Sequence, residues 1–280
     1  VPIYVDSEGY AWIGTSNGLN RFNQQTNRVV RFQNDPRNPN SLGSNDILSI
    51  TEDQGGYLWI GTTNGLDRFD RVTSTFTHFR RDTQNEGSIS SNYIYVVYVD
   101  SQNQVWVGTT AGLDRLDRAT GQFIHYTPRK DDPTSISGTL VYSIHEDSAG
   151  KLWVGTFESG LNRFDPETGL FTQYRHDPQD KTSLNNDSIM TIYEDSKNRL
   201  WFGTDGGGLS LYHPETDSFT YYLEKDGLPN GVVYGILEDD LGTLWMSTNF
   251  GISNFNPETK VFRNFDASDG LQSNEFNSFA

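Results

Sequence analysis

The sequence has no cysteine among its 280 residues, which excludes disulfide bonds and chemistry at a thiolate. It has no apolar run near the roughly 20 residues that span a bilayer, and it shows no signal peptide. Basic residues are few, because 21 Lys and Arg stand against 37 Asp and Glu, for a formal net charge of -16. A surface this acidic repels phosphate groups, so we expect no nucleic-acid partner and no direct membrane insertion of this segment.

Repetition, in contrast, runs through the whole sequence. The six tryptophans stand 47, 47, 47, 48 and 44 residues apart, and each follows an aspartate by six residues. A glycine comes two residues after the tryptophan in five copies, and Ser247 replaces it in the sixth. An interval of about 47 residues is typical of one β-propeller blade. The tryptophans are Trp12, Trp59, Trp106, Trp153, Trp201 and Trp245, and the aspartates are Asp6, Asp53, Asp100, Asp147, Asp195 and Asp239.

Each copy has the pattern of four short strands. In the second copy we expect strands at residues 47–52, 57–62, 66–70 and 75–80, which are rich in β-branched and aromatic residues and bounded by turn residues. We therefore predict an all-β fold, a β-propeller of six four-stranded blades in a single domain over residues 1–280. The repeats are expected at about 1–46, 47–93, 94–140, 141–188, 189–232 and 233–280.

The ends of the sequence leave the closure of the ring open. Phe279 of the tail and Ile3 of the N-terminus both align with Ile236 in a first strand, so they compete for one position. In one alternative the tail helps to close a six-bladed ring, which we favour because an open ring exposes unpaired edges. In the other it begins a seventh blade, and the chain is an incomplete seven-bladed propeller.

Two columns of charged residues recur in the repeat. The aspartates precede turn residues and are expected to cap turns, since a catalytic acid is not needed in every blade. Arginines on the third strand are expected to form ion pairs or to stack on aromatic rings. They are Arg21, Arg68, Arg115 and Arg163, and Leu211 and Asn254 replace them in the last two copies.

Neither metal ions nor cofactors are expected. Asp-Pro loops at 35–36, 132–133 and 177–178 lack the pattern of a calcium loop and favour turns capped by the aspartate side chain. The five histidines lack zinc-site spacing. His78 and His125 are at equivalent positions on fourth strands, which suggests a surface role, while His145 lies on a first strand near the expected axis.

Positions that break the repeat are the best candidates for a binding site. The loop between the second and third strands is one residue longer in copies four and five. It contains Phe157 and Glu158 in copy four, and Asp205 in copy five. These loops share the face of the long inter-blade connections, and an aromatic plane beside carboxylates suits a sugar ring. Ordinary loop variation is the alternative. The candidate ligand-binding residues are Asn17, Asn64, Tyr142, His145, Phe157, Glu158, Asp205, Asn249 and Phe250.

The repeated string Glu-Asp-x-x-Gly-x-Leu-Trp-Ile/Val-Gly-Thr-x-x-Gly-Leu-x-Arg-Phe-Asp, seen most fully at 52–70 and 146–165, resembles the two-component regulator propeller repeat. In that family such repeats form periplasmic sensor propellers of hybrid histidine kinases, many of which respond to carbohydrate fragments. The resemblance implies a non-enzymatic bacterial sensor domain, periplasmic or extracellular. It also implies a small-molecule or oligosaccharide ligand and a possible homodimer formed through the parent protein.

Two other functions stay open. One is an enzyme similar to the propeller lyases that open antibiotic lactones, for which His145 with Glu146 or Glu194 offers the needed histidine and acid. The other is a structural or protein-binding scaffold.

Overall fold

The computed structural model describes residues 1–276. Its strands form six four-stranded antiparallel sheets, and in each the strands lie side by side in sequence order. The predicted all-β propeller of six four-stranded blades is therefore confirmed. Phe279, which we aligned with a first strand, lies outside the described residues, so the closure of the ring stays a prediction.

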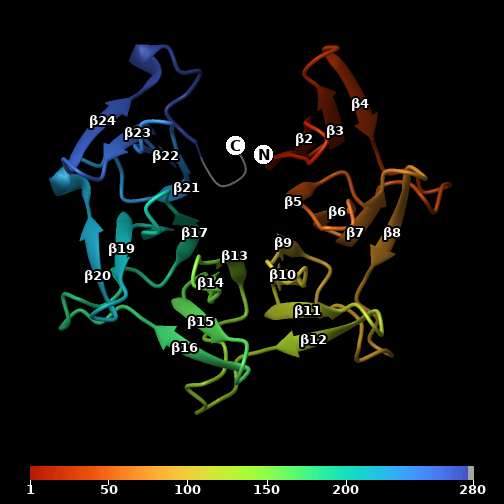
Figure 1. Cartoon of the computed structure of the whole chain (residues 1–280), viewed down its shortest axis with the longest axis horizontal. Coiled ribbons are helices and arrows are strands. Elements are labelled where there is room, and N and C mark those ends of the chain that lie inside the picture. Colours follow the sequence, from red (N-terminus) through yellow and green to blue (C-terminus); the bar gives the residue numbers. More distant parts are fainter. Residues whose placement is uncertain (277–280) are drawn as a thin grey trace. The chain divides into compact units, whose positions relative to one another are not determined.

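The chain divides into two compact units, and each is described by itself. Residues 1–127 and 139–141 form the first unit, and residues 128–138 together with those from 142 onward form the second. Three blades belong to each. Within each unit, the blades fan out with the first strand at the inner edge and the fourth strand at the outer edge (Figure 1).

The first unit holds blades 1 to 3. Its strands are β1 (Ile3–Val5), β2 (Tyr10–Thr15), β3 (Gly18–Asn23), β4 (Arg28–Phe32), β5 (Ile47–Glu52), β6 (Leu58–Thr62), β7 (Gly65–Asp70), β8 (Thr75–Phe79), β9 (Ile94–Val99), β10 (Val105–Thr109), β11 (Leu113–Asp117) and β12 (Gln122–Tyr126).

The second unit holds blades 4 to 6, with 3-10 helices at Glu224–Asp226 and Ala267–Asp269. Its strands are β13 (Val141–Glu146), β14 (Leu152–Thr156), β15 (Leu161–Asp165), β16 (Leu170–Tyr174), β17 (Ile189–Glu194), β18 (Leu200–Thr204), β19 (Leu209–His213), β20 (Ser218–Tyr222), β21 (Val233–Glu238), β22 (Leu244–Thr248), β23 (Gly251–Asn256) and β24 (Val261–Phe265).

Within each unit, the core consists of apolar layers between consecutive blades. Trp12 of blade 1 packs with Ile50 and Phe69 of blade 2, and its ring lies 5.5 Å from that of Phe69. The repeated glycine permits this close packing, since a Cβ on Gly61 would lie only 2.9 Å from Ile94 of the next blade. Five of the tryptophans are 2% exposed or less, whereas Trp245 of blade 6 is 37% exposed.

The aspartate before each tryptophan does more than cap a turn. In blade 1, Asp6 Oδ1 accepts the backbone N–H groups of Glu8 and Tyr10, as the sequence predicted, while Oδ2 accepts Trp12 Nε1 at 2.6 Å. The tryptophan bond recurs in all six blades. These carboxylates are therefore structural, and each one fixes the orientation of the indole that fills the layer.

In blades 2, 5 and 6 these hydrogen bonds also favour the ionised form of the aspartate. Burial by itself would raise the pKa of Asp53, but hydrogen bonds from Trp59 and Arg118 outweigh it and hold the pKa below its usual value. In blade 6, hydrogen bonds from Thr243 and Trp245 lower the pKa of Asp239 to about 2.

The repeated arginines stack on the tryptophans, which confirms one of the two roles predicted for them. Their guanidinium carbons lie 5.5 to 5.9 Å from the indole centroids in blades 1 to 4. In blade 5, where Leu211 replaces the arginine, Arg199 from the turn before β18 covers Trp201 at 5.6 Å instead. The stacking contact is kept although the position that supplies it changes.

The structure adds a specific role to the surface role that the sequence analysis suggested for His78 and His125. Their side chains are 21% and 29% exposed, and each Nδ1 lies 2.6 Å from the buried carboxylate of Asp67 or Asp114. Each Nε2 lies near a carbonyl oxygen of an inter-blade connection, 3.0 Å from Pro39 and 2.9 Å from Glu86. The two histidines therefore fasten these connections to the blades.

The Asp-Pro loops are turns capped by aspartate, as predicted. Asp35, Asp132 and Asp177 each accept the backbone N–H two residues later at 2.8 to 3.0 Å. Within residues 1–276, no helix has the length and hydrophobicity that crossing a bilayer requires.

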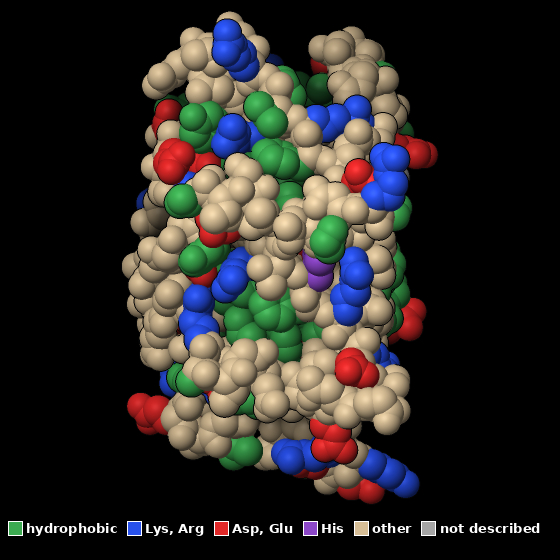
Figure 2. Space-filling view, turned by 90° about the vertical axis from the view of Figure 1, so that its right-hand side faces the viewer, with side chains coloured by type: hydrophobic (Ala, Val, Ile, Leu, Met, Phe, Trp, Pro, Cys, Tyr) green, Lys and Arg blue, Asp and Glu red, His purple; other side chains and the backbone are tan. Residues whose placement is uncertain are grey.

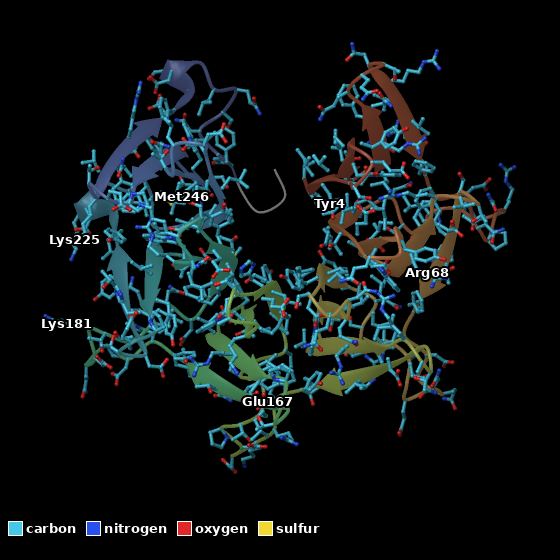
Figure 3. All side chains as sticks on the ribbon, viewed as in Figure 1. Tyr4, Arg68, Glu167, Lys181, Lys225 and Met246 are labelled. Carbon is cyan, nitrogen blue, oxygen red and sulfur yellow. The ribbon has the colours of Figure 1, made fainter. Side chains whose placement is uncertain are left out.

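Charged side chains are dispersed over the surface that can be seen. On the face shown in Figure 2, Lys and Arg are interspersed with Asp and Glu and separated by uncharged residues. In Figure 3, the exposed Lys181 and Lys225 extend from the outer side of the second unit, whereas the buried Met246 lies among the strands of blade 6. The acidic character of the chain is therefore not gathered into one patch on the face shown.

Candidate functional site

The loops between second and third strands lie at the same end of the blades as the inter-blade connections. In blade 2, Gly65 N–H donates to Asn92 O of the following connection at 2.6 Å, and in blade 4, Gly160 N–H donates to Asp187 O at 2.7 Å. The sequence analysis placed these two kinds of loop on one face. The hydrogen bonds confirm this, and we call that end of the blades the loop face.

The two longer loops of the second unit meet at the start of β17. The backbone N–H of Glu158 donates to Ser188 Oγ at 3.0 Å, and that of Asp205 donates to Ser188 O at 2.9 Å. Asn186 Nδ2 also donates to Asp205 O at 3.0 Å. The connection from blade 4 to blade 5 therefore joins both loops into one surface, although nothing in the sequence points to Ser188.

An aromatic pair lies beside this surface. Tyr142 and Phe157 stack with centroids 5.3 Å apart and planes 25° apart, and both side chains are partly exposed. The structure therefore brings together Tyr142, Phe157, Glu158 and Asp205, four of the candidate residues. We call these four residues the aromatic loop cluster.

Glu158 holds a backbone conformation that side chains disfavour. Its φ is 59°, and the residue at the same place in the longer loop of blade 5 is Gly206, with φ 98°. The left-handed region costs a residue with a side chain roughly 1–2 kcal/mol, and such strain is common at functional sites. Glu158 is exposed and directly follows Phe157 of the aromatic pair in the chain.

The other loop candidates lie in other blades. Asn17 and Asn64 belong to the first unit, where Asn17 Oδ1 accepts from Gln33 at 2.9 Å and Asn64 Nδ2 donates to Gly43 O at 3.3 Å. Asn249 and Phe250 form the corresponding loop of blade 6, where Phe250 is 51% exposed.

His145 lies apart from the aromatic loop cluster. It follows Tyr142 by three residues on β13, which places it about 10 Å further along the strand and on the other face of the sheet. Its Nε2 lies 3.7 Å from Glu194 Oε2, but that carboxylate already accepts Ser148 N–H at 2.9 Å and Ser148 Oγ at 2.6 Å. Burial lowers the pKa of His145 and favours the neutral imidazole.

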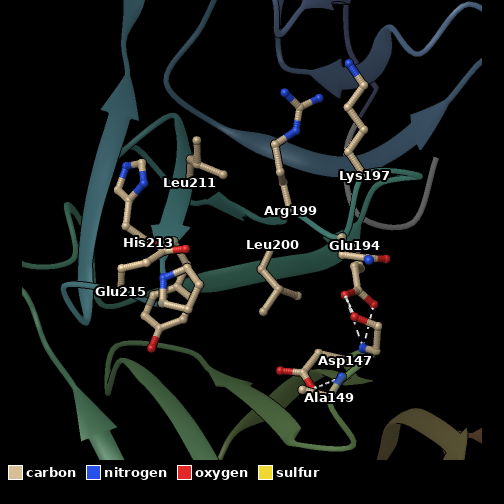
Figure 4. Close-up of a pocket in the computed structure, with 13 residues that line it drawn as sticks. Asp147, Ala149, Glu194, Lys197, Arg199, Leu200, Leu211, His213 and Glu215 are labelled. Carbon is tan, nitrogen blue, oxygen red and sulfur yellow. Dashed lines mark hydrogen bonds between the residues drawn. The ribbon is translucent and has the colours of Figure 1, made fainter.

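A cavity of about 490 Å³ opens at the opposite end of blades 4 and 5 from the loop face. The turn at 147–149 forms one wall, and the turn at 197–199 and the end of β19 form the rest, with Leu200 between them (Figure 4). Asp147, Glu194 and Pro214 also line it. The sequence analysis missed this cavity, and we call it the junction cavity.

Comparison with known proteins agrees with this architecture. The family model of the two component regulator propeller matches residues 41–64, 88–111, 135–158, 183–206 and 227–250. The chain therefore contains five two-component regulator propeller repeats. Each matched segment runs from the end of an inter-blade connection to the loop between second and third strands, so the propeller repeats include Phe157 and Asp205.

One curated relative is Histidine kinase P4 of Formosa agariphila, which is 38% identical over 55 residues. That match covers 20% of this chain and 4% of the kinase. The chain therefore spans only a small part of this relative's length.

Solved structures share the fold of the propeller repeats. The extracellular domain assigned to a hybrid two component system of B. thetaiotaomicron is 23% identical, with a TM-score of 0.81 over 98% of this chain and 36% of that chain. An inactive variant of virginiamycin B lyase from Staphylococcus aureus, solved with quinupristin, is 14% identical, with a TM-score of 0.73 over 98% of this chain and 85% of the lyase. Both likenesses are of fold alone.

Proposed function

We propose that these propeller repeats are a non-catalytic sensor domain of a two-component signalling protein, held outside the cytoplasm, that binds carbohydrate at the aromatic loop cluster. The run of regulator propeller repeats supports the sensor role. The stacked pair of Tyr142 and Phe157 is the observation that carries the ligand class. A partly exposed aromatic face can pack against a sugar ring while neighbouring carboxylates accept hydrogen bonds from its hydroxyl groups.

The signalling step follows from where the cluster lies. Ser188 joins the loops of blades 4 and 5, so a ligand that bridges Phe157 and Asp205 would hold the two blades in one arrangement. Such a ligand would bias any docking surface that both blades contribute to. A homodimer formed through the parent protein stays a prediction.

This proposal can be tested by screening a panel of oligosaccharides for binding with thermal-shift measurements and titration calorimetry. We expect at least one to raise the melting temperature and Phe157→Ala to weaken its binding by about tenfold, which corresponds to the loss of one stacking contact. Thr63→Ala, in the corresponding loop of blade 2, is the matched control and should bind normally. A panel without any binder, or unchanged binding by Phe157→Ala, contradicts the proposed ligand site.

The lyase alternative is less well supported by the geometry. A general base needs an acid within hydrogen-bond reach to orient it, yet His145 Nε2 lies 3.7 Å from Glu194 Oε2. Incubation with quinupristin, followed by mass spectrometry for ring opening, tests this alternative. We expect no turnover, and turnover that His145→Ala abolishes would replace the sensor proposal with an enzyme.

A further inference from the structure

The junction cavity lies where two other blade junctions hold an arginine. Arg71, directly after β7, reaches back to blade 1 and lies 3.4 Å from Asp6, and it also lies 2.7 Å from Glu52 of its own blade. Arg118, directly after β11, reaches Asp53 of blade 2 at 3.0 Å. In both junctions a guanidinium group thus binds the carboxylate that orients a tryptophan.

At the junction of blades 4 and 5 the arginine is missing but its acceptors remain. Pro214, directly after β19, stands at the position of Arg71. Asp147 is the equivalent of Asp6 and Glu194 the equivalent of Glu52, and both line the junction cavity. The two acceptors therefore stand at the same repeat positions as those that bind Arg71 in the same chain.

No side chain of the described residues supplies the missing charge to Asp147. Its Oδ1 accepts backbone N–H groups and its Oδ2 accepts Trp153 Nε1, but it forms no ion pair with Lys or Arg within residues 1–276. Lys151, four residues later, lies 3.9 Å from Asp165 instead.

The junction of blades 5 and 6 shows that a proline at this position does not by itself leave the aspartate without a guanidinium group. Pro257 stands there at the position of Arg71. Arg199, four residues after Asp195, donates to Asp195 Oδ2 at 2.6 Å and to Glu258 at 2.9 Å. This junction therefore supplies its own guanidinium group, and the junction of blades 4 and 5 does not.

We propose that the junction cavity binds a guanidinium group, carried by a small ligand or by an arginine side chain of a partner. Asp147 and Glu194 are its acceptors, and a planar guanidinium suits carboxylates because it presents several N–H donors in a fixed fork. Leu200, at the centre of the cavity, packs against the apolar stem that carries the group. Lys197 and Arg199 also line the cavity, but both bind Glu258.

Calorimetric titration with N-acetyl-arginine amide and with N-acetyl-citrulline amide, its uncharged isostere, tests the proposal. We expect the arginine compound to bind at least about tenfold more tightly, and Glu194→Gln to weaken it by about tenfold, because the loss of one charged acceptor removes one charge-assisted interaction. The peptide acetyl-Gly-Arg-Gly-amide separates the two sources. Tighter binding of the peptide indicates a partner's side chain, and equal binding indicates a small ligand.

Two proline variants provide the sharpest comparison. Pro214→Arg restores the arginine of the other junctions and should abolish binding of N-acetyl-arginine amide while the melting temperature stays equal or rises. Pro257→Arg is the matched control, because Asp195 already holds Arg199, and it should bind normally. Equal binding of the arginine and citrulline compounds, no binding of either, or full binding by Pro214→Arg would each overturn the proposal.

Discussion

Blades 2 and 3 hold their inter-blade connections with charged groups, and blade 4 holds the equivalent connection with neutral ones. Asp114 Oδ2 accepts Ser90 N–H at 2.7 Å while His125 contacts Glu86 O. In blade 4, Asn162 Oδ1 accepts Ser137 N–H at 2.8 Å, and Gln173 Nε2 donates to Ser135 O at 2.8 Å. The same strand positions thus perform one structural task with two chemistries.

We call the histidine and carboxylate pairs of blades 2 and 3 the charged tethers, and the amide pair of blade 4 the neutral tether. Only the charged tethers are expected to be sensitive to pH. Both ring nitrogens of His78 and of His125 face acceptors, so only the protonated imidazolium can donate at both. The hydrogen bond to Asp67 or Asp114 raises the pKa of each histidine, and Arg80 opposes this effect at His78. The amides of blade 4 do not titrate, so its tether should hold at any pH at which the fold survives.

The largest effect should come from removing a buried carboxylate. Asp114→Ala leaves His125 and Ser90 N–H without their acceptor and should destabilise blade 3 by about 3–5 kcal/mol, as breaking a buried ion pair does. Asn162→Ala, its neutral counterpart, should cost about 1–3 kcal/mol. Hydrogen exchange of residues 81–92 and 128–138 measures the loss of local stability caused by each substitution. Equal losses in the two connections would contradict the distinction between charged and neutral contacts.

A rise in pH should loosen the connections of blades 2 and 3 only. The folded pKa of each histidine lies above 6.5, so its contribution is fully present below pH 6.5 and is lost as the pH rises through the raised value. We expect a loss of about 1.5–3 kcal/mol per tether. Limited proteolysis from pH 6 to 9 should show cleavage near residues 36–42 and 82–88 before cleavage near residues 130–136. The opposite order would refute the charged tether.

Removal of the neutral tether should have a smaller effect. Gln173→Ala deletes one hydrogen bond to the backbone of the connection and should cost about 0.5–1.5 kcal/mol at every pH. Urea denaturation at pH 6 and pH 8.5 provides the test. A loss that depends on pH would show that another titrating group acts on this connection.

The smallest change in stability should follow from exchanging the two chemistries. Asp114→Asn combined with His125→Gln gives blade 3 the pair found in blade 4, and stability near pH 6 should change by less than about 1 kcal/mol, since partners are replaced rather than removed. The pH dependence of the blade 3 connection should disappear, while blade 2 serves as the internal control through His78. Persistent pH dependence at residues 82–88 would place its source elsewhere.

The sequence was sufficient to predict the blades because the repeat marks every strand and turn six times. The role of the aspartates was predicted only in part, since the spacing of six residues to tryptophan shows a relation but not a hydrogen bond. The bonding role of His78 and His125 was missed because their acceptors, Pro39 and Glu86, are 39 residues away in the chain. Alternation along a strand indicates which side a residue faces but not which connection covers it.

The candidate site shows the same limit. The longer loops at Phe157 and Asp205 could be found by comparing copies, and the stacking of Phe157 on Tyr142 agrees with that choice. The role of Ser188 could not be found, because it depends on hydrogen bonds between neighbouring blades. The replacement of an arginine by Pro214 is visible in the sequence. Its consequence could be understood only once the structure showed that Arg71 reaches the preceding blade.

The uneven burial of the indoles gives the protein a spectroscopic label of its own. Because only Trp245 of the six is substantially open to water, a dissolved quencher such as acrylamide will reach its emission first. Fluorescence measured with and without the quencher therefore separates blade 6 from the five shielded blades. The behaviour of one blade can thus be followed in the unmodified chain, without an added dye.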